Sequence, residues 1–287
     1  MPPDPPSKKI DNYFIDTRSG AEMTRLINQD RFITEAMGGL FSERSDIDTM
    51  HAILDLGCGP GQWVRDVAYE YPKIAVTGID ICDMTIEYAR AHASVQGLDN
   101  AHFQVMDITK PLEFGDNSFD LVNGRLIAFL SPEQWTALLR ECMRIVRPGG
   151  LIRLTENEVV TTSLATDTAF SLFYRALTRA GQSFSPTGRV LGITSRLSNL
   201  LKKAGCTNVQ YRAHALDFSA GTAIQETFCK VTSLFLTLIQ PFLIGTGVTT
   251  QEELEDLLYQ MEVEMYSDDF SAVMFFLTAW GEKPQDA

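Results

Sequence analysis

The sequence has 287 residues, of which 45% are hydrophobic and 21% are charged, and its formal net charge is -13. This is the composition of a globular protein large enough to bury a core without disulfides or metal ions, which excludes a disordered chain, collagen and a coiled coil. The acidic balance, with no basic run to offset it, disfavours nucleic acid and anionic membranes as partners.

Cysteine usage and hydropathy bear on the cellular compartment and on whether the chain crosses a membrane. The five cysteines are dispersed with no C-x-x-C pair, so the sequence predicts no metal site and favours a reducing, cytoplasmic compartment. The N-terminus lacks the apolar segment of a signal peptide. The most apolar stretch, Val231–Val248, contains polar residues and Pro241 and is therefore predicted to be a buried helix rather than a membrane span.

Residues 1–12 carry four prolines and are predicted to be disordered, and a helical apolar pattern runs from Gly20 to about Leu40. Strands and helices then alternate. The predicted strands are Ala52–Leu56, Ile74–Ile79, Ala101–Met106, Phe119–Asn123 and Leu151–Leu154, and the predicted helices are Gln62–Tyr71, Met84–Gln96 and Pro132–Val146. This alternation predicts an α/β fold, a doubly wound parallel sheet with helices on both faces.

The remaining chain continues the same domain with long additions. A helix is predicted at 195–204, a strand at Val209–Leu216, helices at about 221–243 and 250–265, and a last strand at Ala272–Ala279. Residues 157–194 and 218–268 exceed ordinary connections, so both are predicted to be inserted helical covers. The domain organisation is thus a tail and helical cover over 1–50 and one α/β domain over 51–287.

A glycine-rich turn is the strongest functional signal. The segment from Asp55 to Gly61 reads Asp-Leu-Gly-Cys-Gly-Pro-Gly directly after a buried strand, so a ligand can approach bare backbone at the start of the next helix. A dinucleotide fingerprint would need glycine where Gln62 stands, which disfavours a nicotinamide dehydrogenase. A carboxylate at Asp55 would repel pyrophosphate and attract an ammonium group.

Two more acids end the next two strands. Asp80 is placed to accept hydrogen bonds from a ribose diol, and Asp107 from an adenine amino group, with Met106 and Ile108 flanking the ring. Each acid alone is commonly a turn or cap residue. Three at adjacent strand ends beside this turn predict a nucleoside site at one edge of the sheet.

These motifs together resemble the class I S-adenosylmethionine-dependent methyltransferases. Residues 55–61 resemble their first motif, Asp80 their ribose-binding acid, residues 106–107 their adenine contact, residues 116–122 the approach to strand four, and residues 147–150 the turn before strand five. The resemblance implies a Rossmann-like, seven-stranded sheet whose one antiparallel strand is Ala272–Ala279. A weaker resemblance, at Tyr13, Glu22, Arg25, Leu26 and Gln29, is to a small-molecule branch whose N-terminal helices cover the cofactor.

The resemblance implies S-adenosyl-L-methionine as cofactor and S-adenosyl-L-homocysteine as product. The cofactor contacts it implies are Tyr13, Arg25, Asp55, Gly57, Cys58, Gly59, Gly61, Asp80, Ile81, Met84, Met106, Asp107, Ile108, Asn123 and Gly124. Among these, Asn123 is expected at the methionine part.

Methyl transfer from an activated donor needs alignment and exclusion of water more than a rigid triad, and it needs a base only where the acceptor must lose a proton. The candidate catalytic residues are Arg125, Glu156 and His214. Arg125 either orients an anionic acceptor or pairs with Glu156, and His214 is either a general base or a structural histidine. Ser163, Phe173 and Tyr174 either wall the acceptor site or pack helices.

The large apolar residues of 218–268 predict an apolar pocket or a dimer contact. The expected partner is therefore a small, apolar or aromatic methyl acceptor, with no nucleic acid, no membrane and a homodimer as one arrangement. Three rivals remain: a cyclase or other non-methylating enzyme of this fold, a non-catalytic cofactor-binding subunit, and the disfavoured dehydrogenase. The sequence leaves the acceptor atom open among O, N, C and S.

Overall fold

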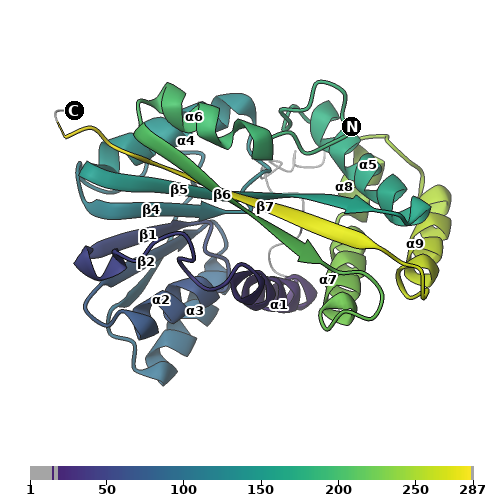
Figure 1. Cartoon of the computed structure of the whole chain (residues 1–287), viewed down its shortest axis with the longest axis horizontal. Helices are drawn as coiled ribbons and strands as arrows, with labels where there is room; N and C mark the ends of the chain where they lie inside the picture. The colour runs from purple at the N-terminus through teal and green to yellow at the C-terminus, as the bar shows by residue number, and fades with distance from the viewer. Residues whose placement is uncertain (1–14, 16–18, 286–287) are drawn as a thin grey trace, which may run out of the picture.

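The computed structural model describes residue 15 and residues 19–285. One seven-stranded sheet has the order β3-β2-β1-β4-β5-β7-β6 (Figure 1). Its strands are β1 (Ala52–Leu56), β2 (Ala75–Asp80), β3 (Ala101–Val105), β4 (Phe119–Arg125), β5 (Val146–Thr161), β6 (Thr207–Asp217) and β7 (Ala272–Glu282). Only β7 runs antiparallel to its neighbours β5 and β6, so the predicted Rossmann-like sheet is confirmed.

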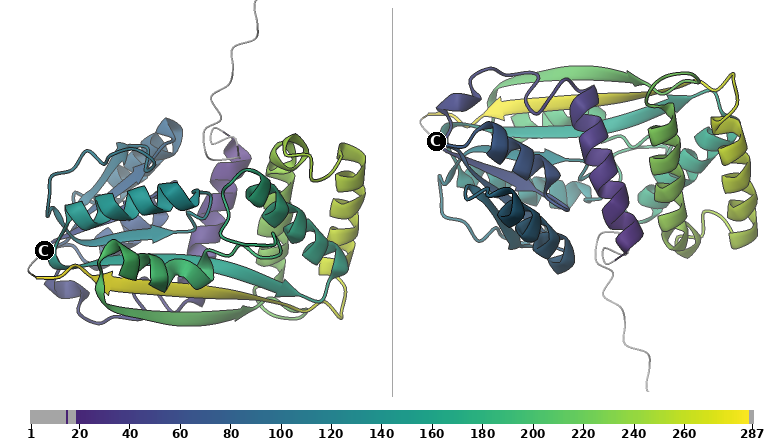
Figure 2. Two further views of the ribbon diagram at one scale, coloured as in Figure 1. Left: turned by 90° about the horizontal axis from the view of Figure 1, so that it is seen from above. Right: turned by 90° about the horizontal axis from the view of Figure 1, so that it is seen from below.

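Helices cover both faces of the sheet and one end of its long strands (Figures 1 and 2). The helices are α1 (Gly20–Ala36), α2 (Gln62–Glu70), α3 (Asp83–Gln96), α4 (Pro132–Ile145), α5 (Leu164–Arg179), α6 (Leu197–Ala204), α7 (Gln225–Leu238), α8 (Gln240–Gly245) and α9 (Gln251–Met265), with 3-10 turns at Ile47–Thr49 and Thr194–Arg196. Helices α1, α2 and α3 lie on one side and α4 and α6 on the other. The remaining helices gather beyond the parallel half, where α1 bridges from α2 to α7.

Local sequence explains where the helices begin and end. Helix α4 starts at a capping box, in which Ser131 Oγ accepts from the backbone N–H of Gln134 and the Gln134 side chain accepts from Ser131 N–H. Pro132 occupies its first turn, where no N–H is needed. Helix α3 ends at Gly97, whose φ of +68° is left-handed. Both boundaries agree with the sequence prediction.

The inserted segments differ from the prediction in two places. Strand β5 continues to Thr161 rather than ending at Leu154, because β7 pairs with it throughout. The segment 157–194 therefore begins as sheet and holds one long helix, α5. The predicted helix 221–243 is split into α7 and α8 beside Pro241, which has no N–H to continue the helical ladder.

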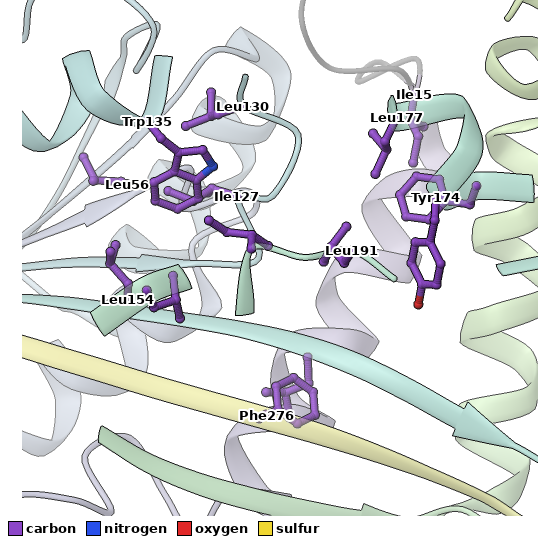
Figure 3. Close-up of a cluster of buried hydrophobic side chains, with 14 of the residues drawn as sticks. Ile15, Leu56, Ile127, Leu130, Trp135, Leu154, Tyr174, Leu177, Leu191 and Phe276 are labelled. Carbon is purple, nitrogen blue, oxygen red and sulfur yellow. The ribbon is translucent and has the colours of Figure 1, made fainter. Parts of the chain in front are cut away.

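Alternate strand residues supply two cores, one on each face of the sheet. Ile53 and Leu121 pack against the side of α2 and α3, whereas Leu54 and Val122 pack on the side of α4. The second core continues into the covering helices. Figure 3 shows its two ends, with Trp135, Leu56 and Leu154 near α4, and Ile15, Tyr174 and Leu177 beside α5.

Across residue 15 and residues 19–285, no helix has both the length and the apolar character that crossing a membrane requires. In the same residues no three His, Cys, Asp or Glu side chains gather as metal ligands would. The predicted disordered segment, residues 1–12, lies outside the described residues.

Gly61 provides a test of how tightly the turn after β1 is packed. Its φ is +72°, and a Cβ atom would lie 2.4 Å from the ring of Phe103. We expect Gly61→Ala to lower the free energy of unfolding by about 3 kcal/mol, from backbone strain plus overpacking. Chemical denaturation measures this. Gly245→Ala in α8, with open space around the site, is the matched control and should be neutral or slightly stabilising; equal losses in both variants would contradict the prediction.

Candidate functional site

The turn after β1 is built by glycines in left-handed conformations. Gly57 has φ +63°, Gly59 has φ +51°, and Gly61 caps the N-terminus of α2. The turn folds back onto β2, since Cys58 N–H donates to the carbonyl of Ile79 (2.9 Å). The backbone of the turn therefore forms one wall of a cavity of about 520 Å³, which is in the size range of small-molecule sites.

The three strand-end acids line this same cavity. Asp80 ties the turn to β2, because its Oδ2 accepts from Gly59 N–H (2.9 Å) and its Oδ1 from Cys82 N–H (2.9 Å). Asp107 Oδ1 accepts from the N–H and hydroxyl of Thr109 (2.8 and 2.7 Å). Burial raises the pKa of Asp80, although these backbone hydrogen bonds oppose the rise. The structure thus brings the carboxyl groups of three separate strands to one cavity.

A row of buried polar side chains runs from Asp55 across the neighbouring strands β4 and β5. Asp55 Oδ1 accepts from Asn123 Nδ2 (2.7 Å), and Asn123 Oδ1 accepts from Arg153 Nη1 (2.7 Å). Arg153 in turn forms an ion pair with Glu43, in the connection between α1 and β1, and both side chains are at most 3% exposed. Residues 55, 123 and 153 are register partners on β1, β4 and β5, which explains their alignment.

A second arginine, half-buried at the end of β4, joins the cover helix to the sheet. Arg125, at the end of β4, forms an ion pair with Asp30 of α1 and donates to Thr34 Oγ1 (3.1 Å). The predicted alternative that Arg125 pairs with Glu156 is therefore wrong. The reason is that α1 crosses the end of β4 and places its own carboxylate there.

The charges around Asp55 favour a cation. Asp55 lies near a second carboxylate, Asp30, and near the guanidinium groups of Arg125 and Arg153. Burial raises the pKa of Asp55 to about 7, against the attraction of Arg125. A ligand ammonium group at this position would be attracted to the ionised form of Asp55.

The cover helix lines the cavity through one of its faces. Glu22 and Arg25 form a buried bidentate pair with contacts of 2.7 and 2.8 Å, and Leu26, Gln29 and Ile33 follow on the same face. These residues recur three or four positions apart, so the sequence alone places them on one face of a helix. The guanidinium of Arg25 is thereby held in the cavity wall by Glu22.

Most predicted cofactor contacts lie in the wall of this cavity. They are Arg25, Asp55, Gly57, Cys58, Gly59, Asp80, Ile81, Met106, Asp107 and Ile108. Gly61, Met84, Asn123 and Gly124 do not line it. Asn123 is fully buried beneath Asp55, and Met84 projects from α3 and is 40% exposed. Tyr13 lies outside the described residues.

Several wall residues escaped prediction. Thr85 and Thr109 contact Asp80 and Asp107 through their hydroxyl groups. Threonines two to five residues after a strand-end acid are a usable local signal. Gln62 and Asp30 were missed as contacts because their positions depend on how α1 and α2 meet the turn.

A second cavity of about 160 Å³ adjoins the first, and Arg25, Gln29, Ile33, Leu126 and Phe129 line both. Its remaining wall residues are mainly aromatic and aliphatic: Phe32, Ala128, Glu156, Asn157, Val159, Phe170, Phe173, Tyr174, Leu177, Leu191, Phe228, Val231, Thr232, Phe235 and Met274. Phe173 and Tyr174 thus lie where an acceptor wall was expected. Ser163 instead caps α5.

The other two catalytic candidates, Glu156 and His214, lie in different parts of the structure. Glu156 lines the second cavity and is 1% exposed; its Oε1 accepts from Ile127 N–H (2.8 Å). His214 lies on the edge strand β6, 3.4 Å from Ser42 Oγ, and lines neither cavity. Burial and Arg212 lower the pKa of His214. Its position favours the structural reading of this histidine.

Comparison with known proteins agrees with the geometry. Residues 53–150 match the methyltransferase domain family. Aklanonic acid methyltransferase DauC of Streptomyces sp. is 37% identical over 42% of this chain and 54% of its own. Demethylmenaquinone methyltransferase of Lactococcus lactis is 27% identical over 57% of this chain and 68% of its own. The secondary metabolism regulator laeA of Coprinopsis cinerea is 30% identical over 36% of this chain and 24% of its own.

Solved structures show the same fold. A Haemonchus contortus phosphoethanolamine N-methyltransferase, bound to S-adenosylhomocysteine, has a TM-score of 0.52 at 17% identity and covers 95% of this chain and 60% of its own. The [4+2]-cyclase SpnF has a TM-score of 0.51 at 21% identity and covers 93% and 97%. Residues 53–150 are therefore a methyltransferase domain, and the resemblance to the class I S-adenosylmethionine-dependent methyltransferases is confirmed.

The first cavity fits the cofactor that defines this class. A side chain at Gly57 would crowd Ile127 at 3.2 Å, so bare backbone is required where a ligand approaches the turn. Asp55, Asp80 and Asp107 all line this cavity, together with Met106 and Ile108. An ionised Asp55 in the cavity wall is compatible with an amine and disfavours a phosphate.

The raised pKa of Asp55 makes binding pH-dependent. An ammonium ligand binds the ionised carboxylate, so affinity is retained above pH 7 and falls as Asp55 protonates below it. Between pH 8 and pH 6 we expect the Kd for S-adenosylhomocysteine to rise about tenfold, because the ionised fraction falls from about 0.9 to 0.1. Calorimetric titration measures it.

Asp55→Asn is the control for that titration, since it should bind more weakly and with no slope over the same range. A wild-type affinity that is flat between pH 6 and pH 8 would show that Asp55 does not meet the amine.

Proposed function

We propose that the protein transfers a methyl group from S-adenosylmethionine to a small apolar or aromatic molecule held in the second cavity. The observation that carries this proposal is the adjacency of the two cavities. One has three acids suited to a nucleoside with an amine, and the other has aromatic walls. They share the wall formed by Leu126, Phe129 and three residues of α1, so ligands in both would meet there.

The residues of this chain would bind and orient the ligands and exclude water from the site. When bound, the cofactor would supply an activated methyl group to an in-line displacement. Asp55, Asp80 and Asp107 would hold its amine, sugar and base, and Arg25 its carboxylate. Helix α1 covers the cavity and, with Phe235 of α7 in contact with Arg25 (5.4 Å), excludes water from the junction.

The size and walls of the second cavity support the acceptor class. Its 160 Å³ is close to the volume of an apolar cavity that accommodates one benzene ring, about 150 Å³. Phe173 and Phe235, which both line this cavity, meet edge to face at 5.1 Å, a favourable geometry for aromatic pairs. The names of relatives such as aklanonic acid methyltransferase also indicate small acceptors. We further propose a role in secondary metabolism, and a reducing cytoplasm, where the five thiols remain unpaired.

Methyl transfer is tested with labelled donor. We expect purified protein, incubated with methyl-labelled S-adenosylmethionine and fractionated small metabolites, to release S-adenosylhomocysteine and place label in an apolar small-molecule fraction. Asp55→Asn should lower the rate at least tenfold at limiting donor. Asp48→Asn, an exposed acid outside both cavities, is the matched control and should leave the rate unchanged.

The outcome also distinguishes methyl transfer from the alternative functions. Donor binding with no S-adenosylhomocysteine and no labelled product in any fraction would contradict the proposal and favour a non-methylating enzyme or a binding subunit.

A further inference from the structure

The second cavity has a polar group with an unused bonding position. In its wall, Arg25 and Gln29 hydrogen-bond to one another, and Asn157 Nδ2 donates to Met274 Sδ (2.9 Å). Glu156 differs: its Oε1 accepts from Ile127 N–H, whereas its Oε2 is buried with no hydrogen-bond partner within the described residues. Leaving such an atom unpaired in the interior is unfavourable, and a ligand donor would remove that penalty.

We infer that Glu156 hydrogen-bonds the acceptor and takes its proton, and that the acceptor is an aromatic phenol or an enol methylated on oxygen. This inference rests on the proposed function and names the substrate class of that site. In the step, the acceptor oxygen bonds to the methyl carbon while the carbon–sulfur bond breaks. The electron pair of that bond stays on sulfur, and the acceptor proton passes to Glu156 Oε2.

The surroundings select a neutral O–H group of moderate acidity. A charged acceptor would lose its hydration among Phe170, Phe173 and Phe228 without a counter-ion of its own. Burial, with Glu158 nearby, raises the pKa of Glu156 to about 8. A phenol, with a pKa near ~10, is within reach of such a base, whereas an alcohol resembling water, at ~15.7, is not.

Position also distinguishes Glu156 from its neighbour on β5. Glu158 is another largely buried acid, but both its oxygens accept backbone N–H groups, from Leu191 (3.2 Å) and Gly192 (3.0 Å), and it lines neither cavity. Glu158→Gln therefore removes a nearby charge without touching the acceptor site, and it is the matched control.

The first test measures binding to the protein saturated with S-adenosylhomocysteine. By calorimetry at pH 7 we expect phenol to bind about tenfold more tightly than toluene, one hydrogen bond being worth about that factor. Glu156→Met should abolish the preference, and Glu158→Gln should keep it. Equal binding of phenol and toluene to the wild type, or no binding of either at millimolar concentration, would overturn the inference.

The second test follows anisole formation from phenol at saturating donor. Because the ionised form of Glu156 is the active one, we expect the wild-type rate to rise about 50-fold from pH 6 to pH 8 and then level off. Glu156→Gln keeps an oxygen for Ile127 N–H, so it should still bind phenol but lose at least 100-fold in rate, with no such rise.

A phenol that binds but is not methylated, an aniline methylated in preference to phenol, or an unchanged rate in Glu156→Gln would each contradict the inference. S-adenosylhomocysteine binding distinguishes a failure of the proposed function from a failure of the inference about Glu156. If the nucleoside does not bind, the proposed function fails; if it binds and only the phenol results fail, the inference about Glu156 alone is overturned.

Discussion

Arg125 and Arg153 are both paired with carboxylates of the N-terminal cover, and the rest of the site depends on these two ion pairs. Arg125 and Arg153 project from neighbouring strands into the side of the sheet that α1 and its connection cover. A buried guanidinium without a carboxylate costs several kcal/mol. Asp30 and Glu43 meet that need from the N-terminal cover, so the same contacts that neutralise the sheet also hold the cover over the cofactor cavity.

Asp55 belongs to this electrostatic unit rather than standing alone. Asn123 couples it to Arg153 by two hydrogen bonds of 2.7 Å, and Arg125 acts on it by charge. Burial raises the pKa of Asp55 to about 7, and the attraction of Arg125 opposes that rise.

Sequence reasoning succeeded where local chemistry determines structure. The glycine turn needs left-handed backbone, and the acids at 80 and 107 follow strands whose carboxyl ends share an edge, so the residues themselves indicated a ligand site there. The seven-stranded sheet and the identity of the cofactor came from the family resemblance. It failed where tertiary packing determines the position of a side chain or the length of a strand. Asn123 was expected in the cavity, but strand register places it beside Asp55, where its side chain is buried. Strand β5 was predicted too short because its partners on β7 lie 111 to 131 positions later in the sequence. Nothing local to Arg125 indicates that its partner is on α1.

The central claim is that an S-adenosylmethionine-type nucleoside lies across the ends of β1, β2 and β3. A crystal structure of the protein with S-adenosylhomocysteine tests it most directly. The account predicts the ligand amine within hydrogen-bond distance of Asp55 and the ribose hydroxyl groups on Asp80, with the Arg125–Asp30 and Arg153–Glu43 pairs intact. Ligand density elsewhere, or an amine turned away from Asp55 toward solvent, would contradict it.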